Sequence, residues 1–227
     1  KLMITALRSF FRYLYLRGDI ATNLAAAVPK VPKWRFTTVP KWIPGEQVTR
    51  LLQSCDQTTG IGRRDYAILI LLSRFGLRAG EIVSMTLDDL NWEAGEIVVR
   101  GKGNRRERLP IPHDVGKALV KYLRKGRPQC VTRRVFIRDR APHQGFRSSG
   151  VIGYVVRRAL TRVGLDPPFK GAHLLRHSLA TEMLRRGGAL NEICELLRHR
   201  HPNTTQIYAK VDLVALNKLA APWPEVA

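Results

Sequence analysis

Three side chains that can bind or polarise a phosphate stand close together in the segment His173-Leu-Leu-Arg176-His177. On a helix, residues three and four positions apart share a face, so these three side chains point the same way. Zinc-binding helices also space two histidines like this, but they carry a glutamate directly after the first, and the intervening arginine would oppose a cation. The spacing favours an anion site without metal. The alternatives are a hydrogen-bonded core role for His177 and an ion pair for Arg176.

A second arginine suited to anions, Arg78, follows a glycine break in the segment Gly76-Leu-Arg78-Ala-Gly80-Glu81. We expect Arg78 at the N-terminus of a helix, where backbone N–H groups favour an anion and a guanidinium can bind a phosphate through two hydrogen bonds. The alternative is a surface ion pair between Arg78 and Glu81 at i, i+3 spacing, worth roughly a few tenths of a kcal/mol.

Tyr208 offers a nucleophile nine residues after His199. One unbroken helix would put these two side chains on opposite faces, but Pro202 ends the first helix, so both can reach one cleft. Tyr208 follows a polar run and is the least core-like of the tyrosines. Core packing is expected for four others, Tyr13, Tyr15, Tyr66 and Tyr154.

The composition indicates a polyanionic partner. Lys and Arg number 39 against 18 Asp and Glu, and the net charge of +21 would attract nucleic acid. Basic proteins of acidic assemblies usually carry their charge in tails without apolar periodicity, unlike this chain. Three distant cysteines indicate neither a disulfide framework nor a zinc site, which fits a reducing cytosol. The aliphatic run at 67–72 is too short to span a membrane, and we expect no leader peptide.

Around these residues the sequence predicts a mainly α fold with a small β-sheet (α+β). A helix is expected over 2–16, before a proline-rich linker between Pro29 and Pro44. Apolar residues then recur at helical spacing over 46–55, 64–75, 79–87, 113–125, 148–163, 172–186 and 190–198. Strands at 96–100 and 106–111 form a hairpin whose tip carries Lys102, and 134–137 is a candidate extra strand.

Four motifs occur in order between residues 76 and 208, namely G-L-R-A-G-E, G-K-G-N-x-R, H-L-L-R-H, and L-x-H followed by T-T-Q-I-Y. Each is weak alone, but together they resemble the tyrosine recombinases, or phage integrases, over nearly the whole catalytic domain. The resemblance implies a set of site residues: Arg78, Lys102, His173, Arg176 and His199 around a Tyr208 nucleophile, with Glu81 in support. It also implies a remnant of the helical core-binding (DNA-clamping) domain plus linker over 1–36 and a catalytic domain over 37–227.

That family implies site-specific recombination or integration of double-stranded DNA through a 3′-phosphotyrosine intermediate. Two guanidiniums and a histidine can meet the negative charge of the transition state, so we expect no metal and no cofactor. Lys102 is expected to protonate the leaving 5′ oxygen. The family works as tetramers on DNA, and the helix that docks on a neighbouring subunit would here be 211–219. From its cysteines we expect the protein in the cytoplasm.

Two features differ from the family pattern. Arg198 stands where the family usually has glycine, and a bulky side chain at a tight helix end would shift His199. We also expect the chain to begin inside a helix, with most of the DNA-clamping domain before Lys1. Both features support one alternative, a non-catalytic or defective DNA-binding remnant of an integrase. The other alternative is a type IB topoisomerase, which uses the same chemistry on a single duplex.

Overall fold

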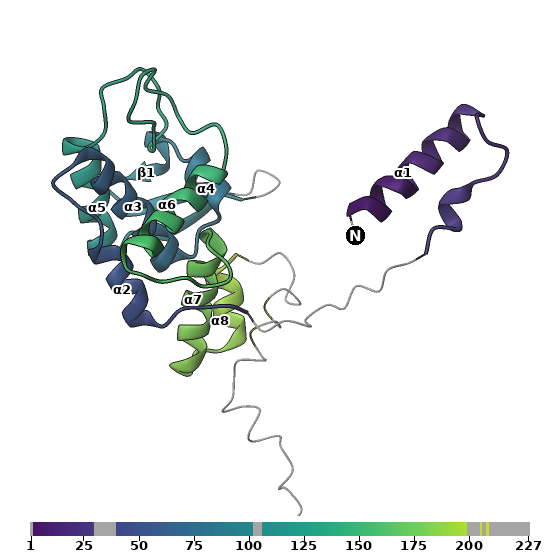
Figure 1. Cartoon of the computed structure of the whole chain (residues 1–227). Helices are drawn as coiled ribbons and strands as arrows, with labels where there is room; N and C mark the ends of the chain where they lie inside the picture. Colours follow the sequence, from purple (N-terminus) through teal and green to yellow (C-terminus); the bar gives the residue numbers. More distant parts are fainter. Residues whose placement is uncertain (1, 30–39, 102–105, 199–204, 206–207, 209–227) are drawn as a thin grey trace, which may run out of the picture. The chain divides into compact units, whose positions relative to one another are not determined.

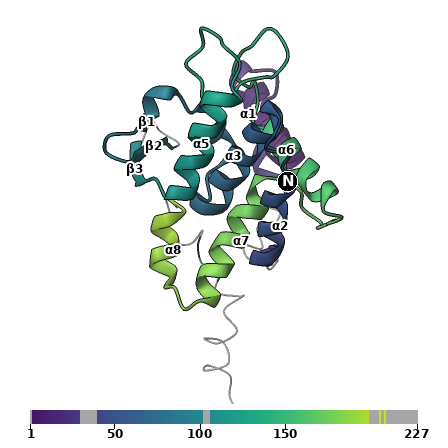
Figure 2. The same cartoon turned by 90° about the vertical axis from the view of Figure 1, so that its left-hand side faces the viewer.

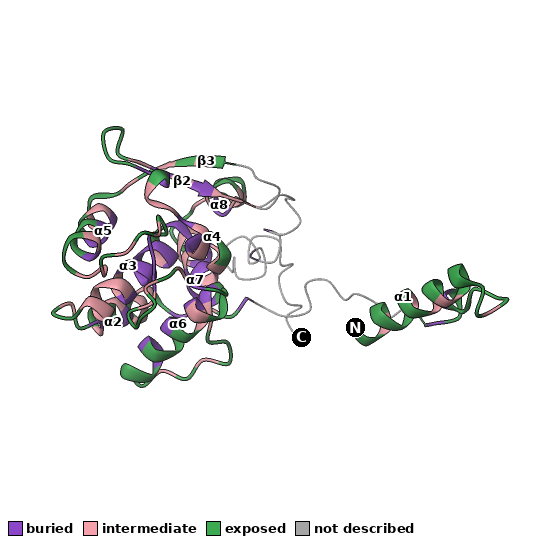
Figure 3. Ribbon diagram, turned by 90° about the horizontal axis from the view of Figure 1, so that it is seen from above, coloured by how far each residue is buried: buried purple, intermediate pink, exposed green. Residues whose placement is uncertain are grey.

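The computed structural model describes residues 2–29, 40–101, 106–198, 205 and 208. The chain forms two compact units, Lys1–Thr38 and Val39–Ala227, whose elements are labelled in Figure 1. The first unit contains α1 (Leu2–Arg17) and the 3-10 helix η1 (Leu24–Ala26). Arg8 of α1 donates a hydrogen bond of 2.6 Å to the Val28 carbonyl, which joins the two elements. Most side chains of α1 are exposed within this unit (Figure 3).

The second unit is organised around one buried helix, α3 (Gly60–Phe75). Its residues 67–72 are at most 1% exposed, because apolar side chains surround the helix on all sides. The helix begins one turn before the predicted start, since Thr59 caps it by accepting the Gly62 N–H at 3.0 Å. Four helices pack against it: α2 (Gly45–Gln53), α5 (His113–Lys125), α6 (Gly150–Arg162) and α7 (Ala172–Arg185). Figure 3 shows the buried positions gathered around this centre.

A three-stranded antiparallel sheet lies at one side of the second unit (Figure 2). The predicted hairpin is present as β2 (Glu96–Arg100) and β3 (Arg106–Pro110), with Val99 opposite Glu107. A short strand that was not predicted, β1 (Leu90–Asn91), pairs with β2.

One buried carboxylate fastens the hairpin to the rest of the unit. Asp89, in the 3-10 helix η2 (Leu87–Asp89), is 2% exposed and pairs with Arg100 at 2.8 Å. The Thr86 hydroxyl donates to the same carboxylate at 2.8 Å. Because Arg100 ends β2, this pairing fixes the strand that leads into the hairpin tip. The tip itself, 102–105, lies outside the described residues.

The helices α7 and α8 (Leu190–Leu196) lie side by side in Figures 1 and 2. They enclose a small apolar cluster of Ala180, Leu184, Ile193, Leu197 and Tyr208. The helix α7 also holds the start of the second unit, because the Ile43 N–H donates to the Ser178 hydroxyl at 2.9 Å. Tyr208, the last described residue, thus packs against α7, the helix that carries Arg176.

The predicted fold class, mainly α with a small sheet, is confirmed. The extra strand expected over 134–137 is wrong, since only isolated bridges form there, at Arg134 with Thr86 and at Ile137 with Gly145. The helix expected over 79–87 is shorter, because α4 (Ala79–Ser84) ends before η2. Within the described parts of the chain, we find no helix that is both long and apolar enough to cross a membrane.

Candidate active site

Two helix C-termini meet at one point, and Arg176 joins them. The Arg176 side chain comes from α7, is buried, and donates to the carbonyls of Gly76, after α3, and Leu197, after α8. The last carbonyls of a helix have no partner within it and carry partial negative charge, so a guanidinium satisfies both needs. Gly76 permits the close approach: its φ is +56°, and a Cβ there would lie 2.7 Å from Leu197 Cδ2. We call this meeting of α3, α7 and α8 the helix-end junction.

Arg78 lies beside the helix-end junction as the N-cap residue of α4, which confirms its predicted place. Its Nη1 pairs with Glu81 Oε1 at 2.7 Å, and its backbone N–H donates to Glu81 Oε2 at 2.8 Å. A third bond of 3.1 Å runs from Arg78 Nη2 to the Arg198 carbonyl. The i, i+3 pair of the alternative is therefore present, but it is not a surface pair, because the Glu81 side chain is 4% exposed while that of Arg78 is 37% exposed. Glu81 therefore acts as a buried anchor that aims a partly accessible guanidinium.

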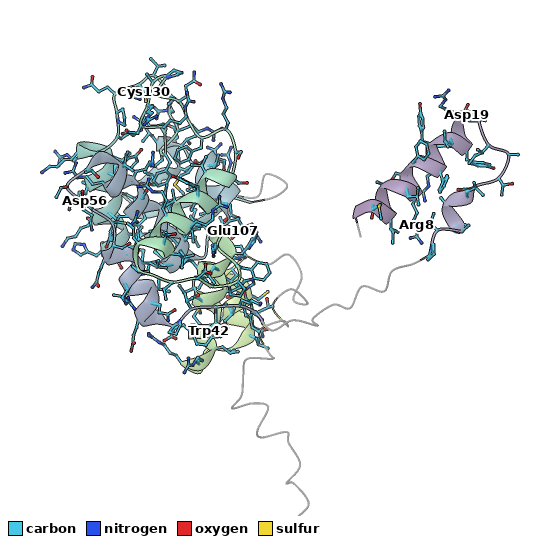
Figure 4. The ribbon with its side chains drawn as sticks, viewed as in Figure 1. Arg8, Asp19, Trp42, Asp56, Glu107 and Cys130 are labelled. Carbon is cyan, nitrogen blue, oxygen red and sulfur yellow. The ribbon has the colours of Figure 1, made fainter. Side chains whose placement is uncertain are left out.

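A third arginine, Arg198, enters the same network from the end of α8. Its side chain is 5% exposed and pairs with Glu81 at 3.3 Å. Its Nε lies 3.8 Å from a carboxylate oxygen of Glu107 on β3, which is labelled in Figure 4. Sequence reasoning treated Arg198 only as a departure from a family pattern and missed these contacts.

Tyr208 is buried at the helix-end junction, with 1% of its surface exposed. Its hydroxyl and His177 Nδ1 are 2.7 Å apart in a hydrogen bond, whose donor depends on which imidazole nitrogen carries the proton. The expectation that Tyr208 is the least core-like tyrosine is therefore wrong. The core-packing expectation also fails for three others, because Tyr13, Tyr15 and Tyr154 are 53%, 44% and 54% exposed.

His177 matches the alternative of a hydrogen-bonded residue inside the fold, and its partner is the predicted nucleophile. His173, four residues earlier, is exposed, and the two ring centroids are 6.3 Å apart. The i, i+4 spacing of the two histidines did place them on one face, as predicted. It could not show that His177, rather than His173, meets Tyr208.

Burial and positive charge shift the pKa values of His177, His173 and Tyr208, and so fix their protonation states at neutral pH. Burial, followed by the charges of His173 and Arg176, lowers the pKa of His177 to about 4. Desolvation of the partly buried His173 ring, followed by the charges of Arg176 and Arg78, lowers the pKa of His173 as well. Burial raises the pKa of Tyr208 to about 12, although the positive charge of Arg176 acts in the opposite direction. At neutral pH the site thus combines cationic guanidiniums with neutral imidazoles and a neutral phenol.

Burial, together with the charges of Arg78 and Arg198, lowers the pKa of Arg176 to about 10. Arg176 still keeps its proton at neutral pH, but its cation is less stable than in water. A phosphate anion beside it would relieve this cost, so the helix-end junction favours an anionic ligand.

Of the predicted site residues, the structure brings Arg78, Glu81, Arg176 and Tyr208 to the helix-end junction, with His173 near it. Lys102 and His199 lie outside the described residues, as does the predicted C-terminal helix over 211–219. The described residues contain no cluster of three or more His, Cys, Asp or Glu side chains able to hold a metal ion.

The amino-acid sequence was also compared with those of known proteins. The model of the phage integrase family matches residues 41–213. The putative integrase/recombinase y4rA of Sinorhizobium fredii is 54% identical over 224 residues, which are 99% of this chain and 54% of that protein. The tyrosine recombinase XerC of Oceanobacillus iheyensis is 33% identical over 219 residues, covering 92% of this chain and 68% of that protein. The chain spans about half the length of the Sinorhizobium relatives y4rA and y4rF.

Solved structures show the same fold. The crystal structure of XerA recombinase matches with a TM-score of 0.66 and 26% identity, over 95% of this chain and 72% of that one. The XerH site-specific recombinase, bound to a palindromic difH substrate in a post-cleavage complex, matches with a TM-score of 0.70 and 23% identity. That second match covers 87% of this chain and 57% of the XerH chain.

The protonation states predict a pH effect on stability. His177 has a pKa of about 4 in the folded chain, against roughly 6.5 when unfolded. The unfolded chain therefore binds the proton more tightly, and stability present above pH 6.5 is lost as the pH falls toward 4. Chemical unfolding of the wild type and of His177→Gln, from pH 7.5 to 4, should show an extra loss of unfolding free energy in the wild type. The full pKa shift corresponds to roughly 3 kcal/mol, and solvent screening of this partly buried side chain reduces the expected loss to about 1–2 kcal/mol. Parallel curves for the two proteins would show that His177 is not held neutral.

Proposed function

Because the chain belongs to the phage integrase family, we propose that it cleaves and rejoins double-stranded DNA through a 3′-phosphotyrosine formed on Tyr208. One observation carries this proposal. The Tyr208 phenol is hydrogen-bonded to α7, the helix whose Arg176 lies buried at the helix-end junction, with the partly accessible Arg78 alongside. A nucleophile is thus held on the helix that carries Arg176, and Arg176 in turn is close enough to Arg78 for their charges to interact. Two such guanidiniums suit a phosphodiester.

In the proposed reaction, the scissile phosphate binds to the partly accessible Arg78 and to Arg176, which is 3% exposed without DNA and must be uncovered first. The phenol oxygen of Tyr208 attacks phosphorus, the P–O5′ bond breaks, and the 3′ phosphate stays joined to the tyrosine. Negative charge grows on the non-bridging oxygens as the transition state forms, and preorganised guanidiniums stabilise that charge. Rejoining reverses these bonds when a 5′ hydroxyl attacks the phosphotyrosine.

Two protons move in this reaction. The phenol proton passes to the imidazole pair of α7, whose nearer member is His177 at 2.7 Å. Since Tyr208 is 1% exposed without DNA, its hydroxyl must be uncovered before it can attack. The leaving 5′ oxygen takes a proton from Lys102, on the hairpin that Arg100 and Asp89 hold in place. His199 assists at the non-bridging oxygens, and Glu81 supports Arg78.

We propose neither metal nor cofactor for this chemistry, because two arginines supply the charge stabilisation that a cation would otherwise provide. The partner is double-stranded DNA, which suits the net charge of +21. The first unit is proposed to be the end of a DNA-clamping domain over 1–36, and 37–227 the catalytic domain. We further propose a cytoplasmic tetramer on DNA, in which each subunit docks the segment 211–219 on its neighbour. The family match and the recombinase relatives do not favour the topoisomerase or the non-catalytic remnant.

The phenylalanine variant of Tyr208 tests the nucleophile. The full chain is incubated in EDTA with nicked duplexes tiled across the DNA that flanks its gene, so that a cleaved short strand diffuses away and traps the adduct. The wild type should form a protease-sensitive covalent adduct, and Tyr208→Phe should form none while DNA affinity changes by less than about threefold, since a neutral hydroxyl is lost. Tyr154→Phe, on the exposed face of α6, is the matched control and should react normally. An adduct formed by the Tyr208→Phe chain would rule out this nucleophile.

An arginine pair tests the phosphate site. Arg78→Ala should slow single-turnover cleavage by roughly two to three orders of magnitude, because a charged donor to the transition state is lost. The matched control is Arg74→Ala, which removes a 56% exposed side chain whose partner is Asp114 on α5. That control should stay within about twofold of the wild type, as expected for an exposed ion pair. Equal rates for the two variants would make Arg78 structural.

A further inference from the structure

Arg198 ends α8 in a backbone conformation that favours glycine. Its φ is +53°, and no other non-glycine residue in the described segments has a positive φ. A side chain in this left-handed region is strained, because Cβ crowds the following carbonyl oxygen. Such strain persists where the surrounding structure holds the residue firmly, and it is often associated with functional sites. The contacts of its side chain explain how Arg198 is held in this conformation.

The guanidinium of Arg198 contacts four elements, α8, α3, α4 and β3. Its Nη1 donates to the Leu196 carbonyl at 2.9 Å and to the Phe75 carbonyl at 3.3 Å, so it bridges the ends of α8 and α3. Its Nη2 pairs with Glu81 of α4 at 3.3 Å. Its buried Nε makes no hydrogen bond with any described residue, and the carboxylate of Glu107 on β3 lies 3.8 Å from it, within reach of charge attraction only.

These contacts make Glu81 a carboxylate shared by two arginines. Oε1 faces Arg78, and Oε2 faces both the Arg78 backbone N–H and Arg198. If Arg198 were absent, the buried charge of Glu81 would be balanced by Arg78, which pairs with it directly, and by Arg176. Arg78 would then be held more strongly by Glu81 and would be less available to a phosphate. The Arg198 carbonyl also accepts from Arg78 Nη2 at 3.1 Å, so the same residue fixes the direction of that guanidinium.

We propose that Arg198 is a positioning residue of the cleavage site: it balances Glu81 so that Arg78 stays available to the scissile phosphate, and it fastens β3 to the helix-end junction. The proposal rests on the proposed function. Arg198 acts through other residues, since its side chain is 5% exposed whereas that of Arg78 is 37% exposed. The link to β3 extends this role to the hairpin that carries Lys102.

The test compares Arg198→Gly, Arg198→Lys and the wild type as full chains. Glycine relieves the backbone strain but removes the buried pair with Glu81 and the donor to two helix-end carbonyls, so Arg198→Gly should melt below the wild type and still be folded at the assay temperature. Its cleavage rate at saturating nicked DNA should nevertheless fall by about tenfold or more, while the DNA concentration for half-maximal rate changes by less than about threefold. Lysine restores the charge without the planar fork, so Arg198→Lys should recover part of the rate.

The contact with β3 has its own variant. Glu107→Gln should slow cleavage less than Arg198→Gly, and the double variant should be no slower than Arg198→Gly alone, because both changes break the same link. Fully additive losses would overturn the proposed link to β3.

The remaining outcomes separate this inference from the proposed function. If the wild type forms no adduct on any tiled duplex, the proposed function fails and takes the inference with it. If the wild type reacts and Arg198→Gly matches its saturating rate, only the inference is overturned. If Arg198→Gly does not fold, Arg198→Lys is the deciding variant. A melting temperature equal to that of the wild type together with a slower cleavage rate supports the proposal. Cleavage at the wild-type rate overturns it.

Discussion

The meeting of two helix C-termini is the constraint on which the site depends. Where α3 and α8 end, carbonyl groups are buried without partners inside their own helices, and each must find a donor or lose stability. Arg176 supplies donors to both ends at once. A buried cation in turn needs negative charge nearby, which the carbonyl ends and Glu81 provide only in part. Because the helix ends require hydrogen-bond donors, a positive charge lies at a position where it can also stabilise a phosphate.

The position of Tyr208, the proposed nucleophile, follows from the same packing. Tyr208 fills the apolar cluster between α7 and α8, and its only hydroxyl is turned to His177. Burial stabilises the neutral phenol, so the chain without DNA holds Tyr208 protonated and covered. Reactivity then depends on an event that uncovers Tyr208, and binding of DNA is the natural candidate.

Local sequence patterns predicted the elements well and the tertiary contacts poorly. The helix α5 and the strand β2 have the predicted bounds, because apolar periodicity and a β-branched run are local signals. The burial of Tyr208 depends on His177, which is 31 residues away, and the pairing of Arg198 depends on Glu81, which is 117 residues away. No periodicity encodes contacts of such separation. The motif order placed Arg78 and Arg176 in one site, but it could not show that Arg198 joins them.

Identification of the linked atom tests the central claim, attack by Tyr208 on DNA at this site, most directly. The adduct formed on a nicked duplex is digested with protease and nuclease, and the nucleotide-bearing peptide is sequenced by mass spectrometry. The account predicts a phosphodeoxynucleotide on Tyr208 joined through its 3′ phosphate, with a free 5′ hydroxyl on the released strand. A link to any other residue, or a tyrosine joined to a 5′ phosphate, would contradict it.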